Sequence, residues 1–404
     1  MPTPVAELVL PVMDEGALRG NDAAADLDDL RSKHWLIRAP LGYVMPNHDD
    51  IVAILRDQRW HNAAALLPLL RGVTDERFVG NSRPSILSTE GDDHQRLRRL
   101  VGPAFTPKSA DRLRPFMRTV LDELVDPIAG VGRAELVRDV CEPYPIPIIC
   151  ELLGAPREDW QLFSRWATDL LAVFDADMAD KLDSIAAARS ALDDYTEQLI
   201  AHRRAEPGED LLSALIAVEE EGDRLSMDEL MSMANAVLVA GTDTTRNQLG
   251  IALAVFAAHP DQWGLLAEEP GLAPQAVEEC MRYSGAVRGT GRFASTDIEY
   301  RDVLFPQGTL VFPSLFGGNH DPNIWDDASR FDIRRDRPVP QLTFGSGVHF
   351  CMGAFLARAE LQEALPLLAR RLPDLAIDGE VTWKPPTVAI WGPSHLPVTF
   401  TRTG

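Results

Sequence analysis

The amino-acid sequence predicts a mainly α-helical protein with small β-sheets, and two patterns support this prediction. Apolar residues recur at three- and four-residue spacing, as on one face of a helix, in the six segments 111–125, 160–174, 179–204, 227–259, 274–283 and 352–372. Segments rich in β-branched and aromatic residues are sparser, at 43–44, 298–311 and 381–400. No repeat or long linker divides the chain, so we expect residues 1–404 to form a single domain, although this length could hold two or three.

The composition excludes several classes of partner. The formal net charge is −22, and a surface this acidic repels phosphate backbones and anionic lipids, so we expect neither nucleic acid nor a membrane as a partner. Residues 1–21 lack the basic start of a signal peptide, and no run of about 18 apolar residues predicts a membrane span. The four cysteines form no C-x-x-C pair, which favours a reducing compartment. We expect a cytoplasmic monomer.

One predicted helix is unusually long. Ser226 and Glu229 form the capping-box pattern, and the apolar period then continues to His259, before Pro260. At 1.5 Å per residue this helix is about 50 Å long. Its middle, A-G-T-D-T-T at 240–245, contains weak helix formers.

Two interpretations of residues 240–245 remain open. The segment is either a tolerated irregularity, in which Thr244 bonds back to the carbonyl of Ala240, or a kink where small residues let a flat group approach. In the second interpretation, Asp243 and Thr244 provide an acid and a hydroxyl for proton transfer beside that group.

The strongest chemical signal is the run F-G-S-G-V-H-F-C-M-G at 344–353. A lone cysteine is most often a small buried apolar residue. Here two glycines predict a tight loop in which the backbone approaches a ligand closely, and Cys351 stands at the start of a helix, where free N–H groups stabilise a thiolate. Such a thiolate is a suitable axial ligand for haem iron.

This run is similar to the haem-binding loop of the cytochrome P450 haem-thiolate monooxygenases. Four other segments follow in the order and approximate spacing of that family. Residues 240–245 resemble its oxygen-activating motif, 279–282 its E-x-x-R pair, 330–332 the segment that completes a Glu–Arg–Arg cluster, and 94–98 the H-x-x-x-R of soluble bacterial members. The resemblance extends over most of the chain and implies the cytochrome P450 fold, with the long helix lying over a buried haem.

The resemblance assigns roles to individual residues. Cys351 is implied as the only protein ligand to the iron of haem b. The other residues implied to bind haem are His94, Arg98, Arg292 and His349, as donors to the propionates, with Phe344, Gly353, Ala240 and Gly241. Glu279, Arg282 and Arg330 are implied to form a buried structural cluster, whereas spacing alone also fits a surface ion pair between the first two.

The implied activity is hydroxylation with O₂ and two electrons. Thr244 is implied to hold bound oxygen by a hydrogen bond, and Asp243 to relay protons from solvent. Two other classes stay open: a haem-thiolate peroxygenase or isomerase that needs no redox partner, and a haem sensor or carrier that is not an enzyme. The intact pair of Asp243 and Thr244 favours the monooxygenase.

The substrate is predicted from four pocket positions. Val239, Ala240, Val287 and Thr290 are small or apolar, which favours a small or mid-sized hydrophobic substrate such as a terpenoid, steroid or aromatic compound. Arg288 could instead indicate an anionic substrate, but neighbours in an extended segment face opposite sides, so we expect its side chain to point away from the haem.

The electrons are predicted to come from another protein. The chain has no G-x-G-x-x-G after a predicted strand, so we expect NAD(P)H to act through a reductase and an iron–sulfur ferredoxin or a flavodoxin. Such carriers are acidic, and docking to a chain of charge −22 requires a local basic surface. The candidates for this surface are Arg96, Arg98, Arg99 and Arg358.

Overall fold

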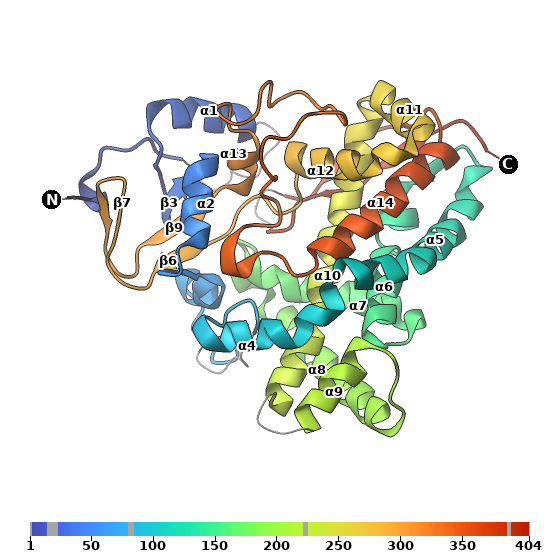
Figure 1. The fold of residues 1–404 in the computed structure, drawn as a ribbon, viewed down its shortest axis with the longest axis horizontal. Coiled ribbons are helices and arrows are strands. Elements are labelled where there is room, and N and C mark those ends of the chain that lie inside the picture. The colour runs from blue at the N-terminus through green and yellow to red at the C-terminus, as the bar shows by residue number, and fades with distance from the viewer. Residues whose placement is uncertain (1, 14–22, 80–84, 221–224, 386–388, 404) are drawn as a thin grey trace.

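A computed structural model describes residues 2–13, 23–79, 85–220, 225–385 and 389–403. Helices dominate the described part (Figure 1). The α-helices are α1 (Ala23–Lys33), α2 (His48–Arg56), α3 (Leu67–Leu70), α4 (Gly91–Val101), α5 (Pro107–Ala129), α6 (Pro145–Leu153), α7 (Trp160–Leu171), α8 (Leu182–Ala205), α9 (Leu211–Glu220), α10 (Met227–Ala257), α11 (Pro260–Glu268), α12 (Ala273–Tyr283), α13 (Leu315–Asn319) and α14 (Ala354–Arg371). The prediction of a mainly helical protein with small sheets is confirmed.

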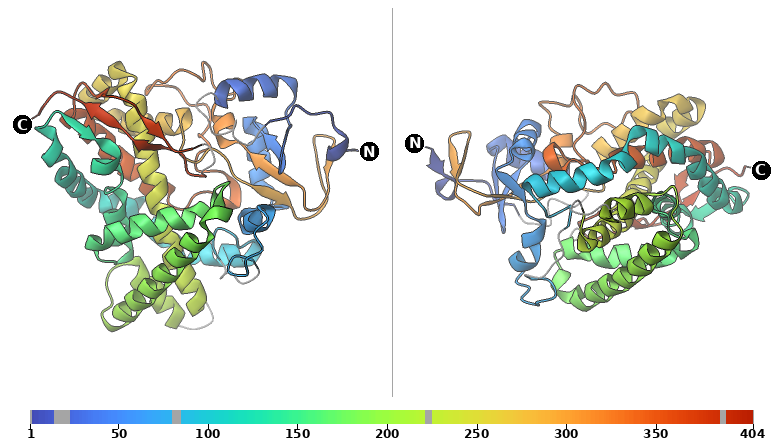
Figure 2. Two further views of the ribbon diagram at one scale, coloured as in Figure 1. Left: turned by 180° about the vertical axis from the view of Figure 1, so that it is seen from behind. Right: turned by 60° about the horizontal axis from the view of Figure 1, so that its bottom comes forward.

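The strands of the described part form four small sheets. The largest contains β2 (Ile37–Ala39), β3 (Gly42–Met45), β9 (Leu310–Pro313), β6 (Arg292–Ala294) and β4 (Trp60–Asn62), in that order across the sheet. The others are β1 (Thr3–Pro4), β8 (Val303–Phe305) and β7 (Ile298–Tyr300); β10 (Ala376–Ile377), β13 (Pro397–Thr399) and β5 (Arg133–Glu135); and β11 (Thr382–Trp383) with β12 (Pro393–His395). The large sheet lies beside α1 and α2, away from most helices (Figures 1 and 2).

The long helix α10 has the predicted start. The Ser226 hydroxyl accepts a hydrogen bond from the Glu229 N–H at 3.2 Å, and the Glu229 carboxylate accepts one from the Ser226 N–H at 2.8 Å. Residues 240–245 are α-helical like their neighbours in α10. It runs through the helical part of the molecule, and its residues 230–256 supply much of the main core (Figure 1).

The predicted helix bounds agree with the structure to within a few residues. Segment 160–174 ends in a 3₁₀ turn at Ala172–Phe174, and 179–204 begins with another at Met178–Lys181. Within the described residues no helix is both long enough and apolar enough to span a membrane.

Candidate functional site

Two adjoining cavities lie beside the middle of α10. The first is lined by the loop 343–353, by α14 and by α10, and Cys351 lies within it. The second, which we call the distal chamber, has a volume of about 360 Å³ and lies between α10, the segment 287–291 and the large sheet. Thr244, Ala240, Val287 and Thr290 line both cavities. Three of the four predicted substrate-contacting positions, Ala240, Val287 and Thr290, are therefore on one shared wall.

The fourth position, Val239, lines neither cavity among the described residues and packs against the main core. The reason is helical periodicity: the lining residues of α10 are Met233, Ala236, Val237, Ala240, Gly241, Thr244, Thr245 and Gln248. They follow the three- and four-residue spacing of one helix face, and Val239 lies outside that face. Applying this helical period to the sequence would have excluded Val239 from the predicted substrate-contacting positions.

The Cys351 loop is held in place by backbone contacts. The Cys351 N–H donates to the Phe344 carbonyl at 3.0 Å, and Gly345 and Gly347 have φ of 71° and 72°, a region that favours glycine. A Cβ on Gly347 would lie 2.0 Å from the Leu55 carbonyl oxygen, so the close approach that this glycine permits is to α2. The sequence had suggested an approach to a ligand.

Cys351 faces the cavity three residues before α14 begins. Its side chain is accessible from the cavity although protein surrounds it, and this burial raises the pKa of the Cys351 thiol above its ordinary value. The Gly353 N–H donates a hydrogen bond to the sulfur. This bond and the charges of Arg98 and Arg358 lower the pKa of the thiol, and so oppose the effect of burial. Phe344 and Gly353 line the same cavity.

A group of basic side chains lines this cavity. Arg98, Arg292 and His349 line it, and Arg292 is only 3% exposed. Burial lowers the pKa of Arg292 to about 10, so the side chain is still a cation at neutral pH. Arg98 donates to the Phe350 carbonyl at 2.8 Å, which connects α4 to the Cys351 loop. These donors suit an anionic group in the cavity.

His94 stands behind this cluster. Its ring lies 4.3 Å from that of His349, and burial together with nearby cations lowers the pKa of His94 to about 4, so it is neutral at physiological pH. The sequence had placed it with the charged donors. Glu90, which sequence reasoning missed, accepts from His349 at 2.9 Å and from the Asn62 N–H.

Thr244 has a feature of each interpretation of residues 240–245. Its hydroxyl donates to the Ala240 carbonyl at 2.8 Å, as in the irregular-helix interpretation, and it also lines both cavities. Gly241 lines the first cavity, but a Cβ there would lie 2.3 Å from Cδ1 of Ile149 on α6. Helix packing is thus one reason for a small residue at 241.

Asp243 of α10 lines neither cavity and is 4% exposed. Its carboxylate forms an ion pair with Arg246, lies 3.7 Å from Nζ of Lys384, and accepts from Asn247 at 3.2 Å. Burial lowers the pKa of Lys384, while the Asp243 charge raises it. Arg246 also donates to Thr168 at 2.7 Å in a surface depression. Arg246 therefore connects Asp243 to that depression.

Glu360 is a further acid that sequence reasoning missed. It projects from α14 into the lining of the first cavity and is 1% exposed. Thr245 forms a side-chain hydrogen bond with it, but burial dominates and raises the pKa of Glu360 to about 8. The carboxyl group is therefore mostly protonated at neutral pH.

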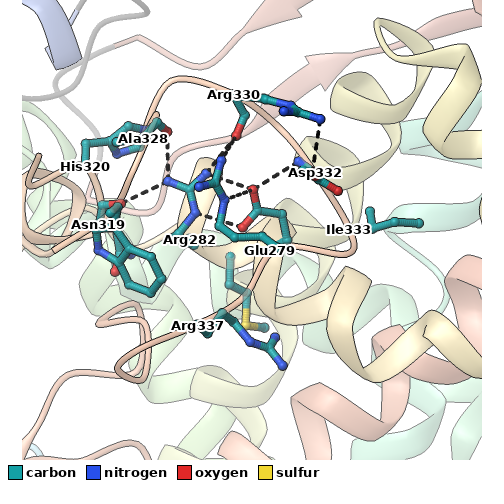
Figure 3. A network of polar contacts seen from close by, with 12 residues as sticks. Glu279, Arg282, Asn319, His320, Ala328, Arg330, Asp332, Ile333 and Arg337 are labelled. Atoms are coloured by element: carbon teal, nitrogen blue, oxygen red, sulfur yellow. Dashed lines mark hydrogen bonds and ion pairs between the residues drawn. The ribbon is translucent and has the colours of Figure 1, made fainter.

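The predicted Glu–Arg–Arg cluster is present with a different third member. Glu279 and Arg282 are buried and joined by two hydrogen bonds of 2.8 Å. Arg335 supplies the third charge, from Nε to Oε1 of Glu279 at 3.1 Å. The Arg330 side chain is 65% exposed and points toward Asp332; only its carbonyl accepts from Arg282 (Figure 3). The chain between them turns so that the later arginine enters the core.

Comparison with known proteins identifies the family to which this chain belongs. The family description Cytochrome P450 matches residues 156–270 and 271–374. The chain belongs to the cytochrome P450 family.

Relatives of this cytochrome P450 include named monooxygenases and hydroxylases. It is 36% identical to luteothin monooxygenase of Streptomyces thioluteus, over 93% of this chain and 92% of that protein. It is 38% identical to the vitamin D(3) 25-hydroxylase of Pseudonocardia autotrophica, over 78% of each. The solved structure of CalO2 has a TM-score of 0.87 at 32% identity, covering 95% of this chain and 97% of that one. The protein is an oxidoreductase of the monooxygenase kind.

The residues fit a haem. A thiol that faces a mostly apolar cavity, with Arg98, Arg292 and His349 at the edge, matches an iron porphyrin with two carboxylates. Cys351 would be the iron ligand, and Arg98, Arg292 and His349 would hold the propionates.

Proposed function

We propose that this cytochrome P450 hydroxylates a small or mid-sized hydrophobic substrate, with haem b held by Cys351 and O₂ as co-substrate. When bound, the haem supplies an iron that takes O₂ and two electrons. The observation that carries the proposal is that Cys351 and Thr244 line one cavity, which continues into the distal chamber. Apolar lining residues such as Phe174 and Leu171 suit an apolar substrate.

Thr244 has a defined role in this proposal. Because its hydroxyl hydrogen is donated to the Ala240 carbonyl, its oxygen is left as an acceptor toward the cavity. It can therefore fix a protonated group there. Asp243 would carry protons from the solvent side of α10, and to do so it must exchange its contact with Arg246 or Lys384.

The test of the thiolate is a carbon monoxide difference spectrum. Cys351→Ser is expected to remove the spectral band of a thiolate-ligated iron, and the buried Cys280→Ser is the matched control that keeps it. A normal spectrum from Cys351→Ser excludes this cysteine as the ligand.

The rival peroxygenase or isomerase class is tested through Thr244→Ala. If the protein activates O₂ with external electrons, the variant binds substrate and consumes NAD(P)H but releases peroxide in place of product. Full product yield with little peroxide would contradict the role of Thr244. A wild-type protein that shows no substrate-dependent NAD(P)H consumption with a ferredoxin and its reductase, but forms product with added peroxide, favours the peroxygenase class.

We also propose that electrons arrive from an acidic ferredoxin or flavodoxin near the Cys351 loop. Of the predicted docking residues, Arg96 pairs with Glu229 and Asp93, and Arg358 with Glu278. Arg99 is exposed on α4. Arg56, which sequence reasoning missed, is exposed on α2 and donates to Ser346 of the loop. Arg99 and Arg56 are the better candidates for contact with a carrier.

A further inference from the structure

The β11–β12 segment, described here as residues 382–385 and 389–395, reaches two places in the molecule. Ala389, Ile390 and Trp391, which precede β12, line the distal chamber. Lys384, which follows β11 directly, has its Nζ 3.7 Å from Oδ2 of Asp243. One short segment therefore supplies part of the wall of the proposed substrate chamber and a contact of the proposed proton carrier.

The backbone of the β11–β12 segment packs closely on α10. The Lys384 N–H donates to the Gly392 carbonyl at 2.9 Å, which joins the two sides of the segment. A Cβ on Gly392 would lie 2.5 Å from Oδ1 of Asn247, and a Cβ on Gly250 would lie 2.9 Å from Cγ of Pro393. This close packing holds the backbone of Lys384 at a fixed distance from α10.

The two oxygens of the Asp243 carboxylate are held by different side chains. Oδ1 pairs with Arg246, one turn later on the same helix. Oδ2 accepts a hydrogen bond from Asn247 at 3.2 Å and faces Lys384. Because this carboxylate is only 4% exposed and is held at both oxygens, its orientation depends on all of these contacts.

The two cations beside Asp243 are held to different degrees. Arg246 is 8% exposed, and its guanidinium donates to the hydroxyls of Ser164 and Thr168 of α7 at 3.1 and 2.7 Å. The Lys384 side chain is 21% exposed, and its amine stands at the end of a flexible four-carbon chain. Of the two contacts, that of Lys384 is therefore the easier one for the carboxylate to exchange.

Asp175 offers the Lys384 amine a second carboxylate. Burial lowers the pKa of Lys384, whereas the charges of Asp243 and Asp175 raise it. Asp175 accepts from the Ala389 N–H at 3.0 Å and from Nζ of Lys181 at 3.0 Å, so it is attached to the same β11–β12 segment. Lys384 can therefore leave Asp243 and still have an opposite charge nearby, which lowers the cost of the exchange.

We propose that Lys384 is a positioning residue for Asp243: it orients the carboxylate for proton transfer, and it is the contact that Asp243 exchanges, while Arg246 stays in place. This inference rests on the proposed hydroxylase function and chooses between the two contacts that it left open. The proton comes from solvent water, is carried by the Asp243 carboxyl group and passes to the group held by Thr244; no electron moves in this step. Without Lys384, the carboxylate is drawn toward Arg246 alone and delivers protons more slowly.

Urea unfolding of the haem-loaded enzyme tests the contact without turnover. Lys384→Met and Asp243→Asn are made singly and together, and we expect the double variant to lose less stability than the sum of the single losses. Lys108→Met, at an exposed lysine of α5, is the matched control and should be additive with Asp243→Asn. If Lys384→Met does not fold, Lys384→Gln takes its place. Additive losses from Asp243→Asn and the Lys384 variant would overturn the inference.

Turnover shows whether the contact serves proton transfer. The probe is whichever of progesterone, camphor and dodecanoic acid the wild type oxidises with NAD(P)H, a ferredoxin and its reductase. Lys384→Met should lower the product formed per NAD(P)H about 10-fold, less than the range of about 10²–10⁴ for loss of the acid itself, and should increase the solvent isotope effect in D₂O. Lys384→Arg should keep most of the product, because it keeps the cation.

A combined variant separates positioning from a general structural role. In an Asp243→Asn background, Lys384→Met should change neither the product yield nor the isotope effect further, since Lys384 acts through Asp243. A further loss of product there, or an unchanged yield from Lys384→Met alone, would contradict the inference. If the wild type oxidises none of the three probes, the hydroxylase function fails, while the unfolding experiment still decides whether Lys384 holds Asp243.

Discussion

At the residue scale, two buried acids of this protein differ in how their charge is balanced. Glu279 forms hydrogen bonds with Arg282 and Arg335, so its burial is compensated by two cations. Glu360 has a hydrogen bond from Thr245, and its Oε1 has no partner among the described residues. A buried carboxyl without a balancing charge is neutral in the folded state, which makes stability depend on pH.

The raised pKa of Glu360 fixes the direction in which the free energy of unfolding changes with pH. Its folded-state pKa of about 8 lies above the ordinary value of 4.5, so its contribution is fully present below pH 4.5 and is lost as the pH rises toward 8. We expect the wild type to lose stability relative to Glu360→Gln across this window, by at most about 1.4 kcal/mol per pH unit. Urea unfolding at several pH values measures this; parallel curves for the two proteins would contradict it.

The Glu279 cluster gives a second prediction at this scale. Arg335→Ala should destabilise the fold by about 1–3 kcal/mol, because it removes a buried hydrogen bond to a charged partner. Arg330→Ala is the matched control: its side chain is 65% exposed, and we expect a change within about 0.5 kcal/mol. Unfolding by urea compares the two. A larger effect from Arg330→Ala would restore the sequence-based assignment.

At the scale of elements, the site depends on contacts between segments that are distant in sequence. The Cys351 loop rests on α2 through Gly347 and is joined to α4 through Arg98. The middle of α10 packs on α6, where Gly241 faces Ile149. These contacts set the distance between the loop and α10, and hence the width of the cavity between Cys351 and Thr244.

Substitutions at two glycines of the Cys351 loop distinguish the cost of backbone strain from the cost of lost packing space. Gly345 and Gly347 have nearly equal positive φ, but a Cβ on Gly345 meets nothing within 4 Å, whereas one on Gly347 meets the Leu55 backbone. Gly345→Ala should cost about 1–2 kcal/mol from conformation alone. Gly347→Ala should cost clearly more and lower the haem content of the purified protein. Unfolding and haem assays test this, and equal costs would show that contact with α2 is unimportant.

At the scale of the whole molecule, the net charge of −22 opposes the acidic carrier that the proposed function requires. Basic side chains near the Cys351 loop can still attract such a carrier locally, because salt screens charges over about 10 Å at 0.1 M. Since Arg96 and Arg358 are engaged with carboxylates, the net attraction depends on residues such as Arg99 and Arg56.

We expect the rate of reduction by an acidic ferredoxin to fall as salt rises. Arg99→Glu should lower this rate at low salt without changing substrate affinity. Arg370→Glu, the same charge reversal on an exposed residue at the end of α14, is the control. Stopped-flow reduction measures both. Equal rates for the wild type and Arg99→Glu at all salt concentrations would place the docking face elsewhere.

The sequence alone determined those features that depend on local periodicity and short motifs. The long helices carry apolar residues at three- and four-residue spacing, so their bounds were predicted to within a few residues, as for α5, α10 and α14. The short α6 was not predicted, because prolines at 145 and 147 within nine residues oppose a helix when the sequence is considered alone, although Pro145 in fact occupies the first position of the helix. The Cys351 loop and the 240–245 motif were identified from their residue types.

Only the tertiary structure decided which residues meet across long stretches of chain. It placed Arg335 in the Glu279 cluster, Gly347 against α2, and Glu360 in the cavity wall. It also brought Lys384 to Asp243. Each of these contacts joins elements whose relative positions depend on the packing of the whole core, and a local sequence pattern carries no information about the distance between such elements.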